Sequence, residues 1–362
     1  MKYLRRFSFT LAFLGLFLAW VWLRPEGPGQ VYQLSGDTMG TRYRVLVTRF
    51  PETVSDNELA DAIEQRLYRI DRELMSTYAP DSELSRFNRA AVGPWMDVSV
   101  ELADVMAQAQ AVSELTGGYF DVTVGPLVDR WGFGPVQEMA DSARIPSDAE
   151  IEQLREQIGY RYLQVSQQPP QLRKLHDVSV DLSGIAKGFG ADVIAGYLDS
   201  VGLESYFIEI GGELRIRGIK PDGSSWVAAI EKPGQGVPEV HDIIVIDGQS
   251  VAIAGSGDYR NFFEQDGVRF SHEIDPFTGR PVSHDLAAVY VITDTAIMAD
   301  ALATAFMVMG AERGQALAQR LNLAAYFITK RSADEGFDSQ YTSRFADYLS
   351  GDEGRSDNNP EG

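Results

Sequence analysis

A lysine stands among glycines in the segment 181–192, DLSGIAKGFGAD. This composition is typical of a phosphate-binding loop, but the P-loop pattern places a glycine directly before its lysine and a Ser or Thr directly after it. Here Gly188 follows Lys187, and Gly184 precedes it by three positions. The segment is therefore not a P-loop, and its lysine needs another explanation.

We predict that a strand through HDVSV (176–180) ends at Leu182 and that Ser183 caps the helix carrying Lys187. A helix N-terminus carries partial positive charge and free N–H groups, so a lysine in the first turn costs about 0.3–1 kcal/mol. Its presence indicates that an anion binds there. Two alternatives stay open: the lysine points into solvent, or it pairs with the aspartate at either end of the segment, Asp181 or Asp192.

Asp300 and Thr304 lie four residues apart in the almost wholly apolar segment 295–309, TAIMADALATAFMVM. Asp294 or Thr295 can cap a helix here, and the spacing places the carboxylate and the hydroxyl on one helical face. A buried carboxylate needs a partner or a metal. One carboxylate and one hydroxyl suit a hard cation such as Mg²⁺, which completes its shell with waters and phosphate oxygens. Alternatively, the hydroxyl donates to the Asp300 carbonyl and the carboxylate faces water.

His272 stands in SHEIDPFTGRPV (271–282), where Pro276 and Gly279 predict a turn after a strand. This histidine could be a general acid or base, or could bind a phosphate; a purely structural role is the alternative.

Two segments combine glycines with aromatic residues, MSTYAPDSELSRFN (75–88) and TGGYFDVTVGPLVDRWGFG (116–134). They could wall a planar heterocycle, or belong to the core like most aromatic runs. With the lysine, the acidic helix and the histidine, they predict a pocket for a large phosphorylated ring system and a hard metal ion.

Amphipathic helices and hairpins must position these residues. Helix signals are found at Ser55 with Glu58, at Ser99 through Gly117-Gly118, and at Ser147 with Glu150 through Ile158 to Gly159. Strands dominate from 205 to 292, with hairpin dipeptides at Asp247-Gly248 and Asp266-Gly267. We therefore predict an α+β fold of antiparallel, hairpin-rich sheets packed with amphipathic helices. Without a GxGxxG motif or alternating βαβ units, it is not a Rossmann domain.

The composition of the 362-residue chain excludes several classes of function. A net charge of −20 argues against nucleic acid as a partner. The absence of cysteine excludes disulfides, thiolate nucleophiles and cysteine-based metal sites. The four histidines form no H-E-x-x-H motif, so a zinc hydrolase is not expected.

The N-terminus predicts a membrane anchor. Three cations precede an uncharged, mostly apolar run, Phe7–Leu23, which is at the short end of a membrane span and also fits an export signal. The bulky Trp20–Leu23 leaves no small-x-small cleavage site, and the cations should stay in the cytoplasm. We predict an uncleaved signal anchor (1–24) with the rest of the chain outside the cytoplasm; cleavage or a buried helix are the alternatives.

Beyond the anchor, a Pro/Gly-rich linker (25–35) is expected to lead into one composite domain (36–349), because no repeat and no second linker interrupt it. The last residues, 350–362, are polar and predicted to be disordered.

The order of these segments resembles the ApbE family, the FAD:protein FMN transferases. The matching blocks, in family order, are GDTMGTRYRV (36–45), MSTYAPDSELSRFN, TGGYFDVTVGPL, DLSGIAKGFGAD, IEIGGELRIRG (208–218), IAGSGDYRNFFE (253–264), SHEIDPFTGRPV and ADALATAFMVMG (299–310). They cover essentially the whole predicted domain. The resemblance implies a single FAD-binding domain of the ApbE, T-fold-like type.

The resemblance also implies the reaction and its residues. Family members bind FAD and Mg²⁺, transfer the FMN part to a Thr or Ser hydroxyl of a partner protein, and release AMP. The residues implied to contact the nucleotide are Met39, Tyr78, Tyr119, Phe120, Asp121, Asp181, Lys187, His272 and Ile274. The implied metal ligands are Asp300, Thr304 and the backbone carbonyl of Gly184, where many relatives have Ala.

For catalysis, Lys187 and the helix N–H groups are expected to stabilise the charge on the pyrophosphate and on the departing AMP. His272 is the candidate base and Asp258 the alternative, although a loose transition state needs positioning more than a strong base.

By the same resemblance, the acceptors would be flavoprotein subunits of ion-translocating NADH:quinone oxidoreductase or Rnf-type complexes, with the catalytic domain on the periplasmic side of a bacterial inner membrane. Many relatives are lipoproteins, but this chain has no cysteine to acylate, so Phe7–Leu23 must anchor it or be removed. Two alternatives remain: an Mg²⁺-dependent FAD pyrophosphatase, and a non-catalytic FAD-binding storage protein. The latter is disfavoured by the reaction-competent set Lys187, Asp300 and Thr304.

Overall fold

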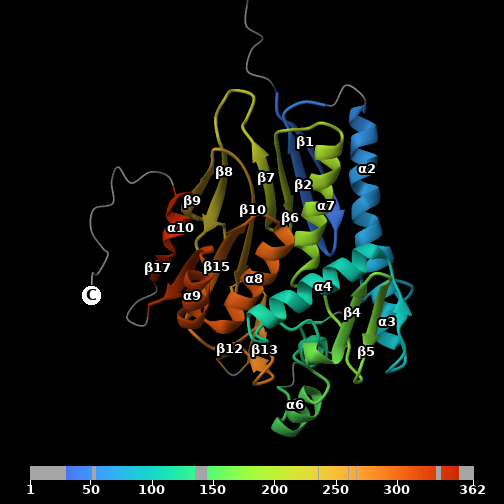
Figure 1. Cartoon of the computed structure of the whole chain (residues 1–362). Helices are drawn as coiled ribbons and strands as arrows, with labels where there is room; N and C mark the ends of the chain where they lie inside the picture. Colours follow the sequence, from blue (N-terminus) through green and yellow to red (C-terminus); the bar gives the residue numbers. More distant parts are fainter. Residues whose placement is uncertain are drawn as a thin grey trace, which may run out of the picture.

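An eight-stranded antiparallel sheet forms the centre of the molecule (Figure 1). The computed structural model describes residues 30–50, 54–134, 145–234, 236–259, 261–265, 267–331 and 336–349. In spatial order the strands of this sheet are β1 (Tyr32–Thr38), β2 (Thr41–Val47), β6 (Tyr206–Ile210), β7 (Glu213–Gly218), β10 (Gly248–Gly257), β15 (Leu286–Thr293), β16 (Ala324–Lys330) and β17 (Phe337–Tyr341). The α+β fold class predicted from the sequence is confirmed.

Helices cover one face of this sheet. The helix α7 (Ala186–Ser200) contacts β6 and β7, and α8 (Ala296–Met309) contacts β10 and β15. α8 is apolar all round and is buried along most of its length, as expected for a helix enclosed by other elements. The surrounding helices are α2 (Asp56–Tyr68), which continues into a π-helical segment (Arg69–Leu74), α3 (Glu83–Arg89), α4 (Val100–Leu115) and α9 (Ala311–Arg320).

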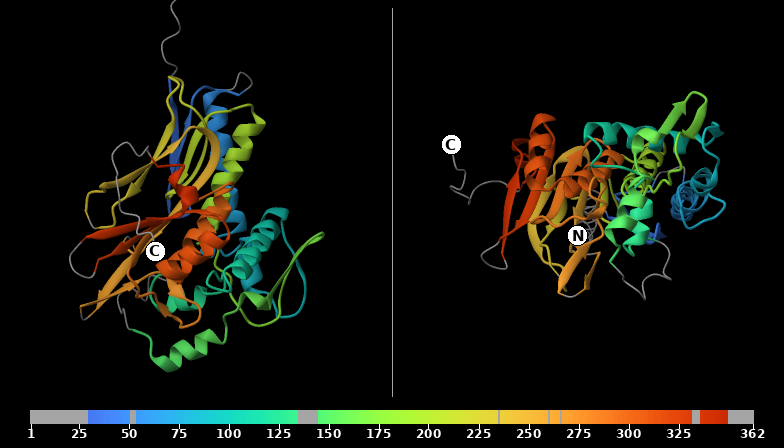
Figure 2. Two further views of the ribbon diagram at one scale, coloured as in Figure 1. Left: turned by 60° about the vertical axis from the view of Figure 1, so that its left-hand side comes forward. Right: turned by 90° about the horizontal axis from the view of Figure 1, so that it is seen from below.

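A second core lies on the other face of the sheet. There a separate hairpin, β8 (Trp226–Glu231) with β9 (Val240–Ile246), packs with α10 (Ser343–Ala346) against residues of the central strands. Because both faces are covered, the middle of β10 and most of β15 are buried without the alternation of a half-exposed strand. Seen from below, the yellow to red strands lie on the left and the cyan and green segments on the right (Figure 2).

Smaller elements complete the end of the molecule near the start of α7. A three-stranded sheet contains β3 (Met96–Asp97), β5 (Pro170–Lys174) and β4 (Leu163–Gln167), which follows a short 3₁₀ turn (Tyr160–Tyr162). The remaining elements are α5 (Gly125–Arg130), α6 (Asp148–Arg155) and two hairpins, β11 (Phe262–Gln265) with β12 (Val268–Ser271) and β13 (Ile274–Asp275) with β14 (Arg280–Pro281).

Serine caps begin the predicted helices as expected. Ser55 and Ser147 form capping boxes with Glu58 and Glu150, and Ser99 accepts a hydrogen bond from the backbone of Leu102. α6 ends at Arg155 instead of Ile158, because the following backbone bonds span only three residues and tighten the last turn.

The two predicted hairpins have different outcomes. The β11–β12 hairpin, whose strands lie on either side of Gly267, is confirmed. The hairpin around Asp247-Gly248 is wrong, although both strands exist: β9 pairs with β8, and β10 pairs with β7 and β15. The dipeptide moves the chain from the outer hairpin into the central sheet, where the apolar β10 is buried on both faces.

Two further predictions near α7 are wrong. Residues 176–182 form no strand, since β5 ends at Lys174. The side chain of Asn88 instead bonds both backbone groups of Val180, which replaces a strand partner. Ser183 is not the helix cap, because α7 begins at Ala186 and Ser183 donates its N–H to the Asp181 carboxylate.

The predicted anchor (1–24) and the predicted tail (350–362) lie outside the described residues. Strand β1 begins at Tyr32, inside the segment predicted as a linker. Within the described ranges, no helix combines the length and the apolar composition needed to cross a bilayer.

Candidate active site

Lys187 and Asp300 meet where the first turns of α7 and α8 pack together. The Lys187 ammonium lies 3.1 Å from Glu213 Oε1 and 3.7 Å from Asp300 Oδ1. It also donates to the carbonyl of Ser183 at 3.3 Å. The alternatives in which the lysine pairs with Asp181 or Asp192 are therefore not what the structure has.

Gly188 allows the two helices to approach this closely. A Cβ on this residue would lie 2.2 Å from the Ala296 carbonyl oxygen and 2.8 Å from the Cβ of Asp300. Without a side chain, the Gly188 N–H reaches Asp300 Oδ2 at 2.9 Å. The close helix contact therefore fixes one oxygen of Asp300 and leaves Oδ1 for other partners.

Asp192 holds the start of α8 in place. Its carboxylate accepts hydrogen bonds of 2.9 Å from the N–H groups of Ala296 and Ile297. Thr295 occupies the N-cap position, as predicted, but its side chain makes no capping bond. The cap is thus supplied by α7, which ties the two helices together at the site.

The charges of the cluster do not cancel. Burial alone would lower the pKa of Lys187, but the carboxylates of Asp300 and Glu213 outweigh it and raise the pKa above its ordinary value. Burial raises the pKa of Glu213, and the neighbouring lysine acts against that change. When both carboxylates are ionised, the protonated lysine between them leaves one negative charge in a buried place, where a further cation would be stabilised.

The residues present fit a hard metal ion. Asp300 is only 2% exposed, so the alternative in which it faces water does not apply. A Cβ on Gly184 would lie 3.2 Å from Thr304 Oγ1, which places that backbone beside the hydroxyl. No described residue takes up the Thr304 hydroxyl. Among the described parts of the chain, no three His, Asp or Glu side chains gather as a metal site. One carboxylate, one hydroxyl and one carbonyl are a set that suits Mg²⁺, which completes its shell with water and phosphate ligands.

The start of α7 offers fewer free N–H groups than its sequence suggests. The N–H groups of Ile185 and Ala186 bond to the carbonyl of Leu182, and Gly188 bonds to Asp300. The carboxylates of Glu213 and Asp300 thus explain why a lysine is tolerated in this turn. Its ammonium is the charged group here that can bind an anion.

His272 lies between two acceptors. Its Nδ1 is 3.1 Å from the carbonyl of Asn261, and its Nε2 is 3.4 Å from Glu273 Oε1. Because a carbonyl only accepts, a neutral ring would carry its proton on Nδ1 and its lone pair on Nε2. The Glu273 carboxylate also acts on the pKa of Lys187, which places the histidine loop beside the lysine cluster.

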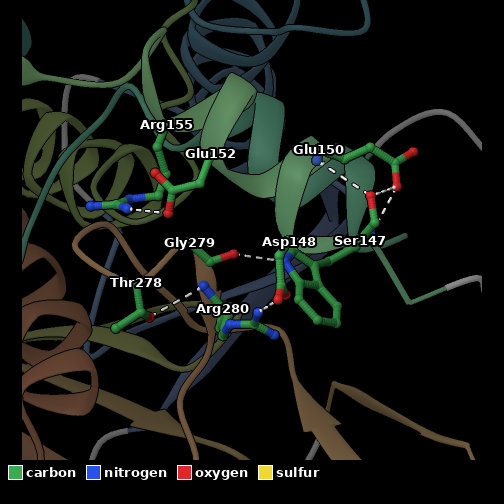
Figure 3. A network of polar contacts seen from close by, with 9 residues as sticks. Ser147, Asp148, Glu150, Glu152, Arg155, Thr278, Gly279 and Arg280 are labelled. Carbon is green, nitrogen blue, oxygen red and sulfur yellow. Dashed lines mark hydrogen bonds and ion pairs between the residues drawn. The ribbon is translucent and has the colours of Figure 1, made fainter.

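The helix α6 fastens the turn that follows this histidine. Trp131 donates its indole N–H to the carbonyl of Gly279 at 2.9 Å. Arg280 pairs with Asp148 of α6 (Figure 3). A Cβ on Gly279 would lie 2.6 Å from the side chain of Ile151. These contacts hold the turn that follows His272 against α6 and Trp131.

Aromatic residues lie around the loop that contains Asp181. Asp181 donates its N–H to the carbonyl of Val122 at 2.7 Å, which joins the two predicted blocks. Phe120 is buried against the position of a Gly184 Cβ, at 3.4 Å. Tyr78 is 67% exposed, and partial burial followed by the charge of Asp181 raises its pKa. The rings of Phe120 and Tyr78 therefore both lie near this loop, and that of Tyr78 is open to solvent.

Tyr119 directly precedes Phe120 in the chain. Its hydroxyl accepts a 2.6 Å hydrogen bond from Arg313, and its ring packs edge-on against Phe277 at 4.9 Å between centroids.

Met39 has a left-handed backbone conformation in the two-residue turn between β1 and β2. Its φ is +48° and that of Gly40 is +71°, and a tight hairpin turn requires positive φ at both central residues. A Cβ on Gly190, one turn beyond Lys187, would lie 3.0 Å from Met39 Cε. The methionine side chain thus faces α7 near the lysine.

Three predicted residues direct their side chains elsewhere. The Asp121 carboxylate accepts hydrogen bonds from Thr123 and from the backbone of Tyr160, which leaves it little capacity for a ligand. Ile274 packs in an apolar cluster with Trp131. The Asp258 carboxylate pairs with Lys330.

Sequence reasoning missed Glu213 and Glu273 as part of the site. Glu213 was part of the block IEIGGELRIRG but was given no role. The pattern that could have identified it is a carboxylate directly after two glycines, in a strand with apolar neighbours. Glu273 stands beside His272 and could have been found from that position.

The chain is similar to known proteins of one family. The model of the ApbE family matches residues 39–327. The chain is 43% identical to the FAD:protein FMN transferase of Vibrio cholerae over 325 residues, covering 90% of this chain and 95% of the relative. It is 38% identical to the corresponding protein of Escherichia coli K12, covering 88% and 90%.

Solved structures are similar in the same way. The flavin transferase ApbE from Vibrio cholerae superposes with a TM-score of 0.80 at 42% identity, over 89% of this chain and 100% of that one. The apo form of Pseudomonas stutzeri flavinyl transferase ApbE gives a TM-score of 0.79 at 36% identity, over 88% and 97%.

Proposed function

This chain belongs to the ApbE family, and we propose that it transfers FMN from FAD to a protein hydroxyl in an Mg²⁺-dependent reaction on the periplasmic side of a membrane. Its activity is that of an FAD:protein FMN transferase, as in the relatives named above. The observation that carries the finer proposal is the buried cluster at the start of α7 and α8, where one lysine stands between two carboxylates and the backbone of Gly184 lies beside the Thr304 hydroxyl.

The metal would be held by Asp300, Thr304 and the backbone carbonyl of Gly184. When bound there, Mg²⁺ would supply charge neutralisation for the pyrophosphate of FAD.

Lys187 is placed to bind the pyrophosphate. Its side chain is 25% exposed, so the ammonium is anchored on Glu213 but still reachable from outside. An ammonium fixed in this way stabilises negative charge that grows on the phosphate oxygens and on AMP, without having to reorganise during the reaction. Its loss should therefore reduce the rate more than it reduces FAD binding.

His272 is the base that the geometry favours. Its Nε2 lone pair can accept the acceptor's hydroxyl proton, and Glu273 would stabilise the imidazolium that forms. Asp258 is less suited, because its carboxylate is held by Lys330.

In the transfer, one bond to phosphorus forms and one breaks. The acceptor's hydroxyl oxygen forms a bond to the FMN-side phosphorus, and the bond between that phosphorus and the bridging oxygen breaks. AMP leaves with the bridging oxygen, and the hydroxyl proton passes to His272 Nε2. The aromatic residues near the Asp181 loop, including the exposed ring of Tyr78, would orient the flavin so that the phosphorus and the hydroxyl are in line.

We propose flavoprotein subunits of ion-translocating NADH:quinone oxidoreductase or Rnf-type complexes as acceptors. The test is to incubate the full chain with FAD, Mg²⁺ and such a subunit, and to separate the products on a denaturing gel. Flavin fluorescence on the subunit band, with AMP in solution, is the expected result. EDTA should abolish both.

The same assay separates the alternatives. FMN and AMP in solution without a labelled subunit would indicate a pyrophosphatase, and unchanged FAD would contradict an enzymatic role. The matched control variant is Glu101→Gln, which removes a carboxylate from an exposed ion pair on α4 and should leave labelling intact.

The periplasmic location rests on the charges before the apolar N-terminal run. A protease added to intact spheroplasts should digest the catalytic domain if it faces the periplasm. Protection that is lost only on lysis would place the domain in the cytoplasm instead.

A further inference from the structure

We infer that Glu213 is a positioning residue of the metal site: it holds the Lys187 ammonium, and this keeps Asp300 available for the cation. The inference rests on the proposed Mg²⁺ site and assigns a role to a residue outside the predicted ligands.

The distances show which carboxylate holds the lysine. The ammonium is 3.1 Å from Glu213 and 3.7 Å from Asp300. Because Gly188 already occupies Oδ2 of Asp300, the oxygen that faces Lys187 is Oδ1. A metal held by Asp300 at this oxygen would meet the ammonium there, so the lysine and the metal would compete for one atom.

Glu213 is itself dedicated to the lysine. The residue is 4% exposed, and its Oε2 is buried with no hydrogen-bond partner among the described residues. A buried carboxylate with so few hydrogen bonds depends strongly on the charge of its one ion-pair partner. Lys187 and Glu213 therefore hold each other, whereas Asp300 also has the N–H of Gly188.

The turn between β6 and β7 shapes this contact. Gly211 and Gly212 have φ values of +59° and +106°, which favour glycine. A Cβ on Gly211 would lie 3.2 Å from Cδ of Lys187. The turn thus lets the lysine stem pass close to the backbone and brings Glu213, the first residue of β7, to its ammonium.

Removing the charge of Glu213 changes the competition. Among the residues that the structure describes, Asp300 is then the one carboxylate left at ion-pair distance from Lys187. The two opposite charges would close on each other in a place of low dielectric. A cation would have to displace the ammonium from Oδ1 before it could bind. Removing the ammonium as well should cancel this effect.

A double-mutant cycle tests the inference. The affinity of the full chain for Mg²⁺ alone, without FAD, is measured by calorimetry for the wild type, Glu213→Gln, Lys187→Met and the double variant. Neighbouring residues that act through each other are strongly coupled, so we expect Glu213→Gln to weaken Mg²⁺ binding about tenfold in the wild type and about twofold or less in the Lys187→Met background. Lys187→Met alone should not weaken binding.

The matched control is Glu209→Gln. Glu209 lies on the same hairpin and pairs with Arg44, but Glu213 stands opposite Ile210, so the two glutamates point to opposite faces of the sheet. This control should leave the affinity for Mg²⁺ unchanged.

Equal weakening by Glu213→Gln in both backgrounds would overturn the inference, because Glu213 would then act as a bare charge. Weaker Mg²⁺ binding in Lys187→Met would also overturn it, and this variant does not require Glu213→Gln to fold. A wild type that binds no Mg²⁺ would overturn the proposed metal site and this inference together, whereas normal wild-type binding with an additive cycle would overturn only the inference.

Discussion

Gly188→Ala should destabilise the protein, although alanine is the better helix former. In an exposed helix this substitution stabilises by about 0.5–1 kcal/mol. At Gly188 the new Cβ would meet the carbonyl oxygen of Ala296 at 2.2 Å and the Cβ of Asp300 at 2.8 Å. A carbonyl oxygen and a Cβ are fixed to the helix backbone, so they cannot move aside without separating α7 from α8.

The magnitude follows from three contributions. Overpacking of a close contact costs about 1–3 kcal/mol, and the lost hydrogen bond from Gly188 to the Asp300 carboxylate costs about 1.5–3 kcal/mol. The gain in helix propensity offsets about 1 kcal/mol of this sum. We therefore expect the free energy of unfolding to fall by about 1.5–5 kcal/mol, together with a loss of Mg²⁺ affinity because Asp300 moves.

Gly196→Ala is the matched control on the same helix. A Cβ there would have no neighbour within 4 Å, so this variant should be as stable as the wild type or more stable by up to about 1 kcal/mol. Urea denaturation followed by circular dichroism measures both variants. If Gly188→Ala matched Gly196→Ala in stability, the close approach of α7 and α8 would not be what positions Asp300.

Three further predictions follow from other contacts. Asp192→Ala removes the acceptor that caps α8, so unfolding in urea should show a loss of about 1–2 kcal/mol; an unchanged midpoint would contradict the capping role. The backbone and side chain of Ser147 hold the pKa of Glu150 at about 2, so the stabilisation from this group is present above its unfolded value of 4.5 and is lost as the pH falls through about 2. In an NMR titration, Ser147→Ala should move that pKa back toward 4.5. Asp300→Asn keeps the size of the side chain but should abolish Mg²⁺ binding and lower transfer about a hundredfold or more; retained metal-dependent turnover would exclude Asp300 as a ligand.

Local patterns predicted the individual elements well. The capping boxes at Ser55 and Ser147 were found correctly because both partners of each box lie three residues apart, so the interaction is complete within the local sequence. The strand content from 205 to 292 and the apolar helix over 296–309 were also readable, since turn dipeptides bound the strands and a long apolar run marks the buried helix.

Pairing between distant strands was less predictable. Asp247-Gly248 has the chemistry of a hairpin turn, but β9 and β10 belong to different sheets, because each finds its partner in another part of the chain. A turn signal states that the chain reverses and does not state which strands then bond.

The amino-acid sequence was enough to predict the fold class, the helix that carries Asp300 and Thr304 on one face, and the blocks of the ApbE family. The partners of Lys187 could be read only from the folded arrangement. Glu213 reaches it from a strand after a glycine turn, Asp300 reaches it from another helix, and Gly188 sets how closely the two helices approach. The charge of a buried cluster depends on such distances between segments far apart in the chain, and no local pattern encodes them.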